Sequence, residues 1–153
     1  MRVWPTDLDV LGHMNNGVYL SIMDHGRMDL MQRSGVWSRM AKSGFYPVMA
    51  NETISFRKSL QPWQRFTIET RIIGYDEKAV YTEQRAVADG EIYAVAVMRG
   101  RFLKRSGGTA TIAEISAATG IDTAGRSVPA WVTRWASDVA LPGTREAAPS
   151  TWD

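Results

Sequence analysis

The hydrophobic pattern of this chain changes its period once. From Gly17 to about Arg33, apolar residues recur at the spacing of one face of an α-helix. The residues on this stripe are Val18, Tyr19, Ile22, Met23 and Leu30. Asn15 or Asn16 can cap the first turn, and Gly35 suits the left-handed position after the last turn. The pattern therefore predicts one long helix.

Farther along the chain, apolar and polar residues alternate, which is the period of a β-strand. The first such segment is expected to place four apolar side chains on one face: Val48, Ala50, Ile54 and Phe56. Three more alternating segments follow, within 66–72, 80–88 and 92–103, and Asp89-Gly90 is a strong hairpin signal. Four consecutive hairpin-linked strands would form an antiparallel sheet with one buried face. The economical packing is a sheet wrapped round the long helix.

The last part of the chain predicts short helices. Thr111–Glu114 has the spacing of a capping box, so a helix should begin there and end at Gly120. A second helical segment starts near Trp131. We therefore expect an α+β fold in which residues 1–105 form one domain. Residues 106–153 are expected to form a C-terminal extension whose short helices pack on the same domain.

Composition excludes several classes of protein. A chain of 153 residues suits one domain with a substantial core. Without cysteine it can have no disulfide framework, thiolate metal site or cysteine nucleophile. The 18 Lys and Arg against 16 Asp and Glu leave a net charge of +2, which is no nucleic-acid footprint. No apolar stretch approaches the ~18 residues of a membrane span, and no targeting signal is visible. We expect a cytoplasmic protein with no nucleic-acid or membrane partner.

The densest group of candidate chemistry lies directly before the predicted helix. The segment from Asp7 to Leu20 reads DLDVLGHMNNGVYL and contains two carboxylates, one of the two histidines and two amides. A helix N-terminus suits negative charge because of its macrodipole and free N–H groups. Elsewhere the sequence has neither a glycine-rich phosphate loop nor a G-x-S-x-G motif, and two histidines without cysteine argue against zinc.

This segment resembles the signature D-x-D-x-x-G-H-x-N-N-x-x-Y-L of hotdog-fold acyl thioesterases, in the 4-hydroxybenzoyl-CoA thioesterase-like and acyl-ACP thioesterase-like branch. The preceding Arg2-Val3-Trp4-Pro5 and the following Met23-Asp24 and Arg27 are also similar, and the likeness extends over roughly residues 1–105. It implies a hotdog fold, in which an antiparallel sheet wraps around one central helix. It also implies hydrolysis of an acyl-CoA-type thioester to a free acid and a thiol, without a metal or other cofactor.

The resemblance implies a role for each polar residue of the loop. Asp9 would be the catalytic carboxylate, which either attacks the carbonyl carbon or activates a water molecule. A backbone N–H near Asn16 or Gly17 would hold the thioester oxygen. His13 and Asn16 would position the acyl group or the water. The same residues also allow structural roles, as a loop acid, a hydrogen-bonded histidine and a helix cap. Leu11 stands where the plant enzymes have asparagine.

Three more residues are candidate substrate contacts. The resemblance implies that Tyr19 and the sheet face line the acyl pocket. Glu52 interrupts an apolar strand face, where burial would suit acid or base chemistry, although a strand edge would leave it in water. Arg57 is one of several cations near strand ends that could contact the phosphates of a CoA or carrier arm, or simply aid solubility.

Resembling proteins join two subunits edge to edge and complete each active site between them, and an open sheet leaves strand edges unpaired. We therefore expect a homodimer or a homotetramer whose substrate is an acyl-CoA or an acyl-carrier thioester. Two other interpretations of the same fold stay open. One is a non-catalytic acyl-binding or scaffold protein. The other is a dehydratase, which usually needs a different arrangement of histidine and aspartate.

Overall fold

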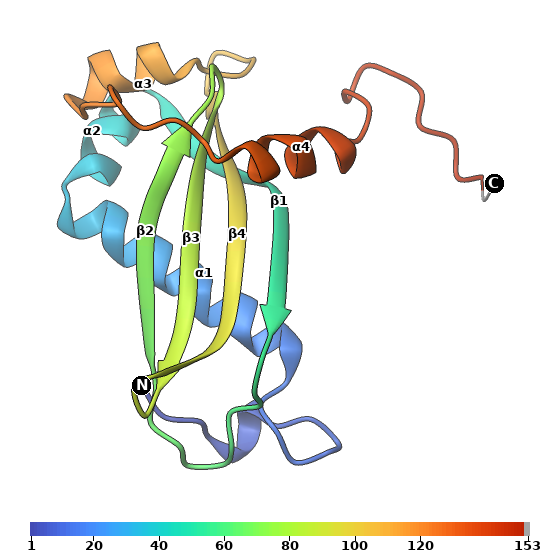
Figure 1. The fold of residues 1–153 in the computed structure, drawn as a ribbon. Helices are drawn as coiled ribbons and strands as arrows, with labels where there is room; N and C mark the ends of the chain where they lie inside the picture. The colour runs from blue at the N-terminus through green and yellow to red at the C-terminus, as the bar shows by residue number, and fades with distance from the viewer. Residues whose placement is uncertain (152–153) are drawn as a thin grey trace.

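One long helix crosses one face of a four-stranded antiparallel sheet (Figure 1). The computed structural model describes residues 1–151, so the last two residues of the predicted extension lie outside the described residues. The helix is α1 (Asn16–Arg33). The strands are β1 (Phe45–Phe56), β2 (Thr67–Tyr75), β3 (Ala79–Ala88) and β4 (Glu91–Lys104). The hydrophobic periods predicted these element types correctly.

The order of the strands differs from the predicted run of hairpins. β2, β3 and β4 follow one another as a meander, whereas β1 pairs with β4, and the order across the sheet is β1-β4-β3-β2. Residues 57–66 form a connection too long for a tight hairpin. This connection is tied to the N-terminal segment, because Val3 N–H donates to Gln64 O at 3.0 Å. β1 and β2 therefore become the two edge strands.

A bulge in β1 changes the predicted faces of this strand. The register against β4 shifts at Ala50, so Val48 pairs with Arg101 and Ile54 pairs with Ala96. Those two partners are an odd number of positions apart on a strand whose side chains alternate between faces. Val48 and Ile54 consequently lie on opposite faces of the sheet, and the prediction that Val48 shares a face with Ile54 is wrong.

α1 begins and ends where the local signals predict. The side chain of Asn15 caps it by accepting from Gly17 N–H at 2.8 Å. Gly35 follows the helix with φ +69°, the left-handed conformation expected there. A second helix, α2 (Val36–Lys42), starts directly after this glycine, and the pattern did not predict it. It has seven residues and no side-chain cap, so packing of its two buried residues supports it rather than local propensity.

α1 approaches the sheet closely because Gly26 faces it. A Cβ atom at this position would lie 3.0 Å from Gln84 Nε2 and 3.2 Å from Ile68 Cγ2. The main core lies here, between the buried face of α1, which includes Tyr19 and Met23, and the inner face of the sheet. Glycine lowers the helix propensity of α1 at this position, but it allows the helix to pack closely against β2 and β3.

The predicted C-terminal helices are present. α3 (Ile112–Thr119) has the expected capping box between Thr111 and Glu114 and packs beside α2 at one end of the sheet. α4 (Ala130–Asp138) lies on the face of the sheet opposite α1 (Figure 1), where Val132 is buried. Among residues 1–151, no helix has both the length and the apolar composition needed to cross a membrane.

Candidate active site

The loop before α1 is a compact turn. Leu8 and Met14 pair as an isolated antiparallel bridge, and within it Asp9 N–H donates to His13 O at 2.8 Å. Gly12 has φ +79°, a left-handed conformation that favours glycine and lets the chain reverse. A bond from Met14 N–H to the connection after β1 ties the loop to the sheet. The loop is therefore held from both sides.

The carboxylate of Asp9 is oriented by the backbone of its own loop. Its Oδ1 accepts from Leu11 N–H at 2.9 Å and from His13 N–H at 3.3 Å. Its Oδ2 has no hydrogen-bond or ion-pair partner among residues 1–151, and the residue is half-buried. One oxygen thus fixes the side chain while the other stays available for chemistry.

The start of α1, seven positions after Asp9, offers one free backbone donor. Gly17 N–H already donates to the side chain of Asn15. Asn16 N–H, by contrast, has no acceptor in the described part of the chain, and this residue is exposed. Because helix N-termini stabilise negative charge, Asn16 N–H is the better placed of the two predicted donors.

His13 and Asp7 differ in how they are held. His13 is half-buried, and its imidazole makes no hydrogen bond within residues 1–151. Asp7 closes a short 3₁₀ turn, Pro5–Asp7, since its Oδ2 accepts from Trp4 N–H at 2.8 Å. Asp7 therefore has a structural partner that occupies its side chain, whereas His13 is free to meet a ligand.

Tyr19 and Arg57 are engaged by other protein groups. Tyr19 is 1% exposed, its hydroxyl accepts from Leu60 N–H at 3.1 Å, and burial raises its pKa. Arg57 lies just beyond β1, where it donates to Ile92 O at 3.2 Å and pairs with Glu91 at 3.4 Å. Tyr19 thus belongs to the core, and Arg57 to an exposed ion pair.

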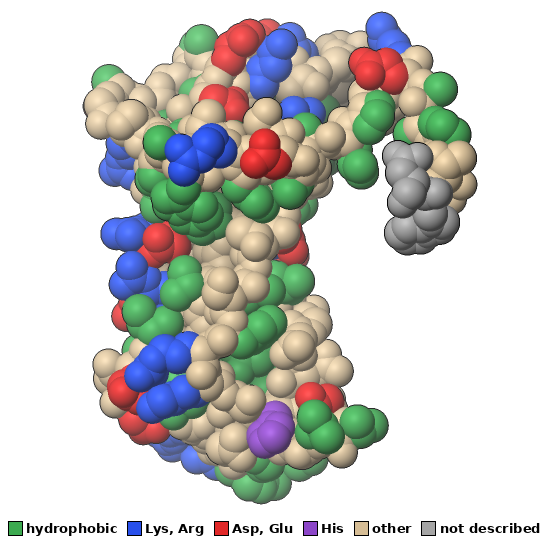
Figure 2. Space-filling model, turned by 45° about the vertical axis from the view of Figure 1, so that its right-hand side comes forward, with side chains coloured by type: hydrophobic (Ala, Val, Ile, Leu, Met, Phe, Trp, Pro, Cys, Tyr) green, Lys and Arg blue, Asp and Glu red, His purple; other side chains and the backbone are tan. Residues whose placement is uncertain are grey.

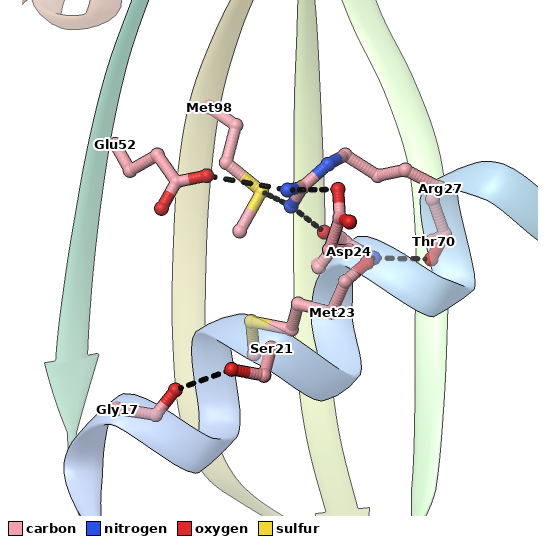
Figure 3. A network of polar contacts seen from close by, with 9 residues as sticks. Gly17, Ser21, Met23, Asp24, Arg27, Glu52, Thr70 and Met98 are labelled. Atoms are coloured by element: carbon pink, nitrogen blue, oxygen red, sulfur yellow. Dashed lines mark hydrogen bonds and ion pairs between the residues drawn. The ribbon is translucent and has the colours of Figure 1, made fainter. Parts of the chain in front are cut away.

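A charged network joins α1 to the sheet (Figure 3). Arg27 on α1 is 12% exposed, and its Nη2 lies 3.0 Å from Asp24 Oδ1 and 3.2 Å from Glu52 Oε1. Since Glu52 belongs to β1, this guanidinium bridges the helix and the edge strand. Glu52 keeps 26% of its side chain exposed and is paired with Arg27. It is therefore an ion-pair partner that links helix and strand rather than an isolated buried acid.

Gln84 on β3 anchors this network inside the core. It is fully buried, and its Oε1 accepts from Arg27 Nη1 at 2.8 Å. Its Nε2 donates to Met23 O and to Thr70 Oγ1, each at 2.8 Å. The carbonyl and both amide protons therefore have partners, which makes Gln84 a rigid support for the arginine.

An apolar cavity of about 490 Å³ lies between the second half of α1, α2, α3 and the sheet. This volume is within the ~300–1,000 Å³ of small-molecule sites. Its wall is mostly apolar and includes Met28, Met31, Val36, Phe102, Ile112 and Ile115. Asp24 and Arg27 also line it, at the end nearest the middle of α1.

The cavity and the loop are separate within one chain. The residues predicted for the site do not line it: Asp9, His13, Asn16, Gly17, Tyr19, Glu52 and Arg57. From Asn16 to Asp24 alone, α1 rises about 12 Å. The sequence interpretation missed this cavity because its wall comes from many separate segments. The methionine-rich second half of α1 was its one local sign.

Charge and metal-ligand patterns add no second site. On the face shown in Figure 2, acidic and basic side chains are interspersed rather than gathered by sign. The described residues contain no group of three or more histidines and carboxylates that could hold a metal ion. The loop and the cavity are therefore the two features from which a function can be argued.

Sequence comparison relates this chain to thioesterases. A model of the Thioesterase-like superfamily matches residues 3–136. Protein THEM6 of Xenopus laevis is 44% identical over 99 residues, which are 65% of this chain and 48% of that protein. The acyl-acyl carrier protein thioesterase ATL2 of Arabidopsis thaliana is 33% identical over 85 residues, which are 55% of this chain and 45% of that protein. The chain spans about half the length of these curated relatives.

Structure comparison agrees on the fold. The crystal structure of YbaW from Escherichia coli, described as a probable thioesterase, matches with a TM-score of 0.73 at 20% identity. The match covers 77% of this chain and 92% of that one. The predicted hotdog fold, a sheet around one long helix, is thereby confirmed. Because the family model spans nearly all of the described chain, the protein belongs to the Thioesterase-like superfamily.

Proposed function

We propose that this protein is a thioesterase that hydrolyses an acyl thioester of the CoA or carrier type to a free carboxylic acid and a thiol. Family membership supports thioester hydrolysis as the reaction class. The observation that carries the proposal is the Asp9 carboxylate, whose Oδ1 is fixed by two backbone N–H groups while Oδ2 is unpartnered among the described residues. A fixed carboxylate in the loop that leads into a helix N-terminus suits attack on a polarised carbonyl.

Two routes are open to Asp9. Its Oδ2 can attack the thioester carbon directly, so that the C–S bond breaks, the thiolate leaves and takes a proton, and water hydrolyses the resulting anhydride. Alternatively Oδ2 takes a proton from a water molecule that attacks the same carbon; the C–S bond then breaks, and the departing thiolate takes that proton, which leaves the free acid and the thiol. In either route, Asn16 N–H would donate to the oxygen that becomes negative. His13, which lacks a partner within residues 1–151, would position the acyl group or the water.

We further propose that two subunits pair through their β1 edges about a twofold axis. The first half of β1 lines the cavity, and the connection after β1 holds the Asp9 loop. An antiparallel β1–β1 pair would therefore bring the loop of one subunit to the cavity of the other. Exposed apolar residues support this contact: Val10 is fully exposed and Leu11 is 76% exposed on the loop, and Tyr46 and Met49 are each 40% exposed beside the cavity. Sedimentation showing a monomer at micromolar concentration would contradict this assembly.

The function is tested by Asp9→Asn, which keeps size and most hydrogen bonding but removes nucleophilicity and basicity. Thiol release from a panel of acyl-CoAs is followed with a thiol reagent. We expect kcat to fall at least ~10²-fold with little change in KM, because the lost step acts on the transition state. Asp7→Asn is the matched control, and it should affect stability more than turnover because Asp7 binds Trp4 N–H.

Two results would contradict the proposal. If Glu52→Gln abolishes turnover while Asp9→Asn leaves it intact, the catalytic acid lies on the strand and the loop is only a helix cap. If the native protein releases no thiol from any acyl-CoA or acyl-carrier thioester, the chain is a non-catalytic acyl-binding or scaffold protein on the same fold.

A further inference from the structure

The cavity beneath α2 and α3 indicates which acyl group would be bound, and this inference rests on the proposed function. We infer that the cavity holds an unbranched aliphatic acyl chain of about a dozen carbons, which fits the width of the four-stranded sheet along its wall. The chain would enter between α1 and β1 and end against α3.

The chemistry of the wall favours an aliphatic group. Nearly all of the wall surface is apolar. Among its polar lining residues, Asp24 and Arg27 are paired with each other, Arg27 is also paired with Glu52, and Ser34 Oγ donates to Met31 O at 3.2 Å. The other polar lining residues are few: Arg101, Thr82, Thr123, Tyr46 and Tyr75. Because the wall is mostly apolar, an acyl group that carries several hydroxyls would lose more hydrogen bonds to water here than the wall could replace, which is costly. A hydrocarbon chain loses nothing by entering and gains from burial.

Gly100 makes room on the floor of this cavity. It lies on β4, a central strand, where glycine weakens the sheet and often marks close approach of a ligand. Its φ is outside the left-handed region, so the backbone conformation does not demand glycine. A Cβ atom would meet Val80 Cγ1 at 3.3 Å and nothing else closer than 3.9 Å. Because Gly100 lines the cavity, any side chain there would project into the space we assign to the acyl chain.

The far end of the cavity is closed by α3, which sets the length. The lining residues cross the whole sheet, from Tyr46 of β1 through Gly100 of β4 and Val80 of β3 to Tyr75 of β2, and three interstrand spacings span about 14 Å. Ile112 and Ile115 of α3 lie at the deep end and are 6% and 3% exposed. α3 is held in place because Ile112 N–H donates to Glu77 O at 2.8 Å. Ile115 is thus the residue that would meet the end of the chain.

The entrance is marked by exposed apolar side chains. Leu30 of α1 and Trp37 of α2 are each 37% exposed, and Met49 of β1 is 40% exposed, and all three line the cavity. They stand on the two sides of the gap between the helices and the edge strand. A thioester held there would have its acyl chain inside and its thiol arm in water, next to where the partner's loop would lie.

The test compares native protein with Gly100→Val and with Ile115→Ala. Binding of free butanoate, dodecanoate and hexadecanoate is measured by calorimetry, and hydrolysis is measured with the matching acyl-CoAs. We expect native protein to prefer the twelve-carbon probe. Gly100→Val, which adds a good strand former, should lose at least tenfold in affinity and kcat/KM for this probe and keep the four-carbon one. Val95→Leu adds bulk on the other face of β4 and is the matched control.

Ile115→Ala separates an effect on the cavity from a loss of folding. Because it shortens the residue at the deep end, it should move the preference toward sixteen carbons, a gain that an unfolded variant could not show. The inference is overturned if no acid binds, or if neither variant changes the chain-length preference. If the acids bind with the expected preference while no thioester is hydrolysed, the cavity assignment stands and the proposed function fails. If thioesters are hydrolysed equally at every length, the function stands and the inference fails.

Discussion

Replacing Arg27 with methionine tests whether the charged network between helix and sheet stabilises the fold. Arg27 Nη1 donates to Gln84 Oε1 at 2.8 Å, and Gln84 is fully buried. Methionine has a similar volume, so packing is largely kept while the donor is lost. The Gln84 oxygen would then be a buried acceptor without a partner, which costs about 1–3 kcal/mol.

The two ion pairs of Arg27 add little to this figure. Asp24 is 63% exposed, and such pairs contribute ~0–1 kcal/mol at most. Glu52 is less exposed, at 26%, so losing its partner adds a modest cost. We expect Arg27→Met to lower the free energy of unfolding by about 2–3 kcal/mol. For a chain of this size that is a fall in Tm of roughly 5–10 °C.

The assay is urea unfolding at one protein concentration, with Arg33→Met as the control. Arg33 lies on the same helix and pairs with Asp29, but both side chains are mostly exposed, at 79% and 53%, so Arg33→Met should leave the urea midpoint close to that of the native protein. A double-mutant cycle with Gln84→Met should show coupling, because removing the amide removes the unsatisfied oxygen. If Arg27→Met is as mild as Arg33→Met, or if the cycle shows no coupling, the reasoning is refuted.

Three further predictions follow from other parts of the molecule. Gly26→Ala should lower the free energy of unfolding by about 1–2 kcal/mol in urea unfolding, because the steric cost of a Cβ against Gln84 and Ile68 exceeds the ~1 kcal/mol gained from helix propensity. A stabilised variant would contradict this. Burial and a hydrogen bond to Asp76 raise the pKa of Tyr81 to about 12, so its contribution to stability is complete below pH ~10 and is lost as pH rises toward the folded value. Tyr81→Phe should remove the Tyr81 part of that alkaline loss and so reduce the fall in stability, as measured by unfolding at stepped pH. Finally, mixing Asp9→Asn subunits with Gly100→Val subunits should restore up to about a quarter of native activity on lauroyl-CoA, because half of the sites in mixed dimers would be intact; no recovery after subunit exchange would mean that each site lies within one chain.

Features that depend on neighbours in the chain were predictable from the sequence. The long helix, its Asn15 cap and the left-handed Gly35 follow from spacing and capping within a few residues. The capping box at Thr111 predicted α3 for the same reason. The candidate catalytic loop was also local, since Asp9 is oriented by N–H groups two and four positions away.

Features that depend on which faces meet were decided only by the tertiary structure. Alternation shows that a segment is a strand, but it contains neither the pairing of β1 with β4 nor the bulge at Ala50. Arg27 and Gln84 are 57 positions apart, and their hydrogen bond exists only because α1 lies across β3. The cavity likewise takes its wall from α1, α2, α3 and the sheet. Periodicity follows from backbone geometry over one or two turns, whereas packing follows from long-range burial, which selects partners that no short window of sequence contains.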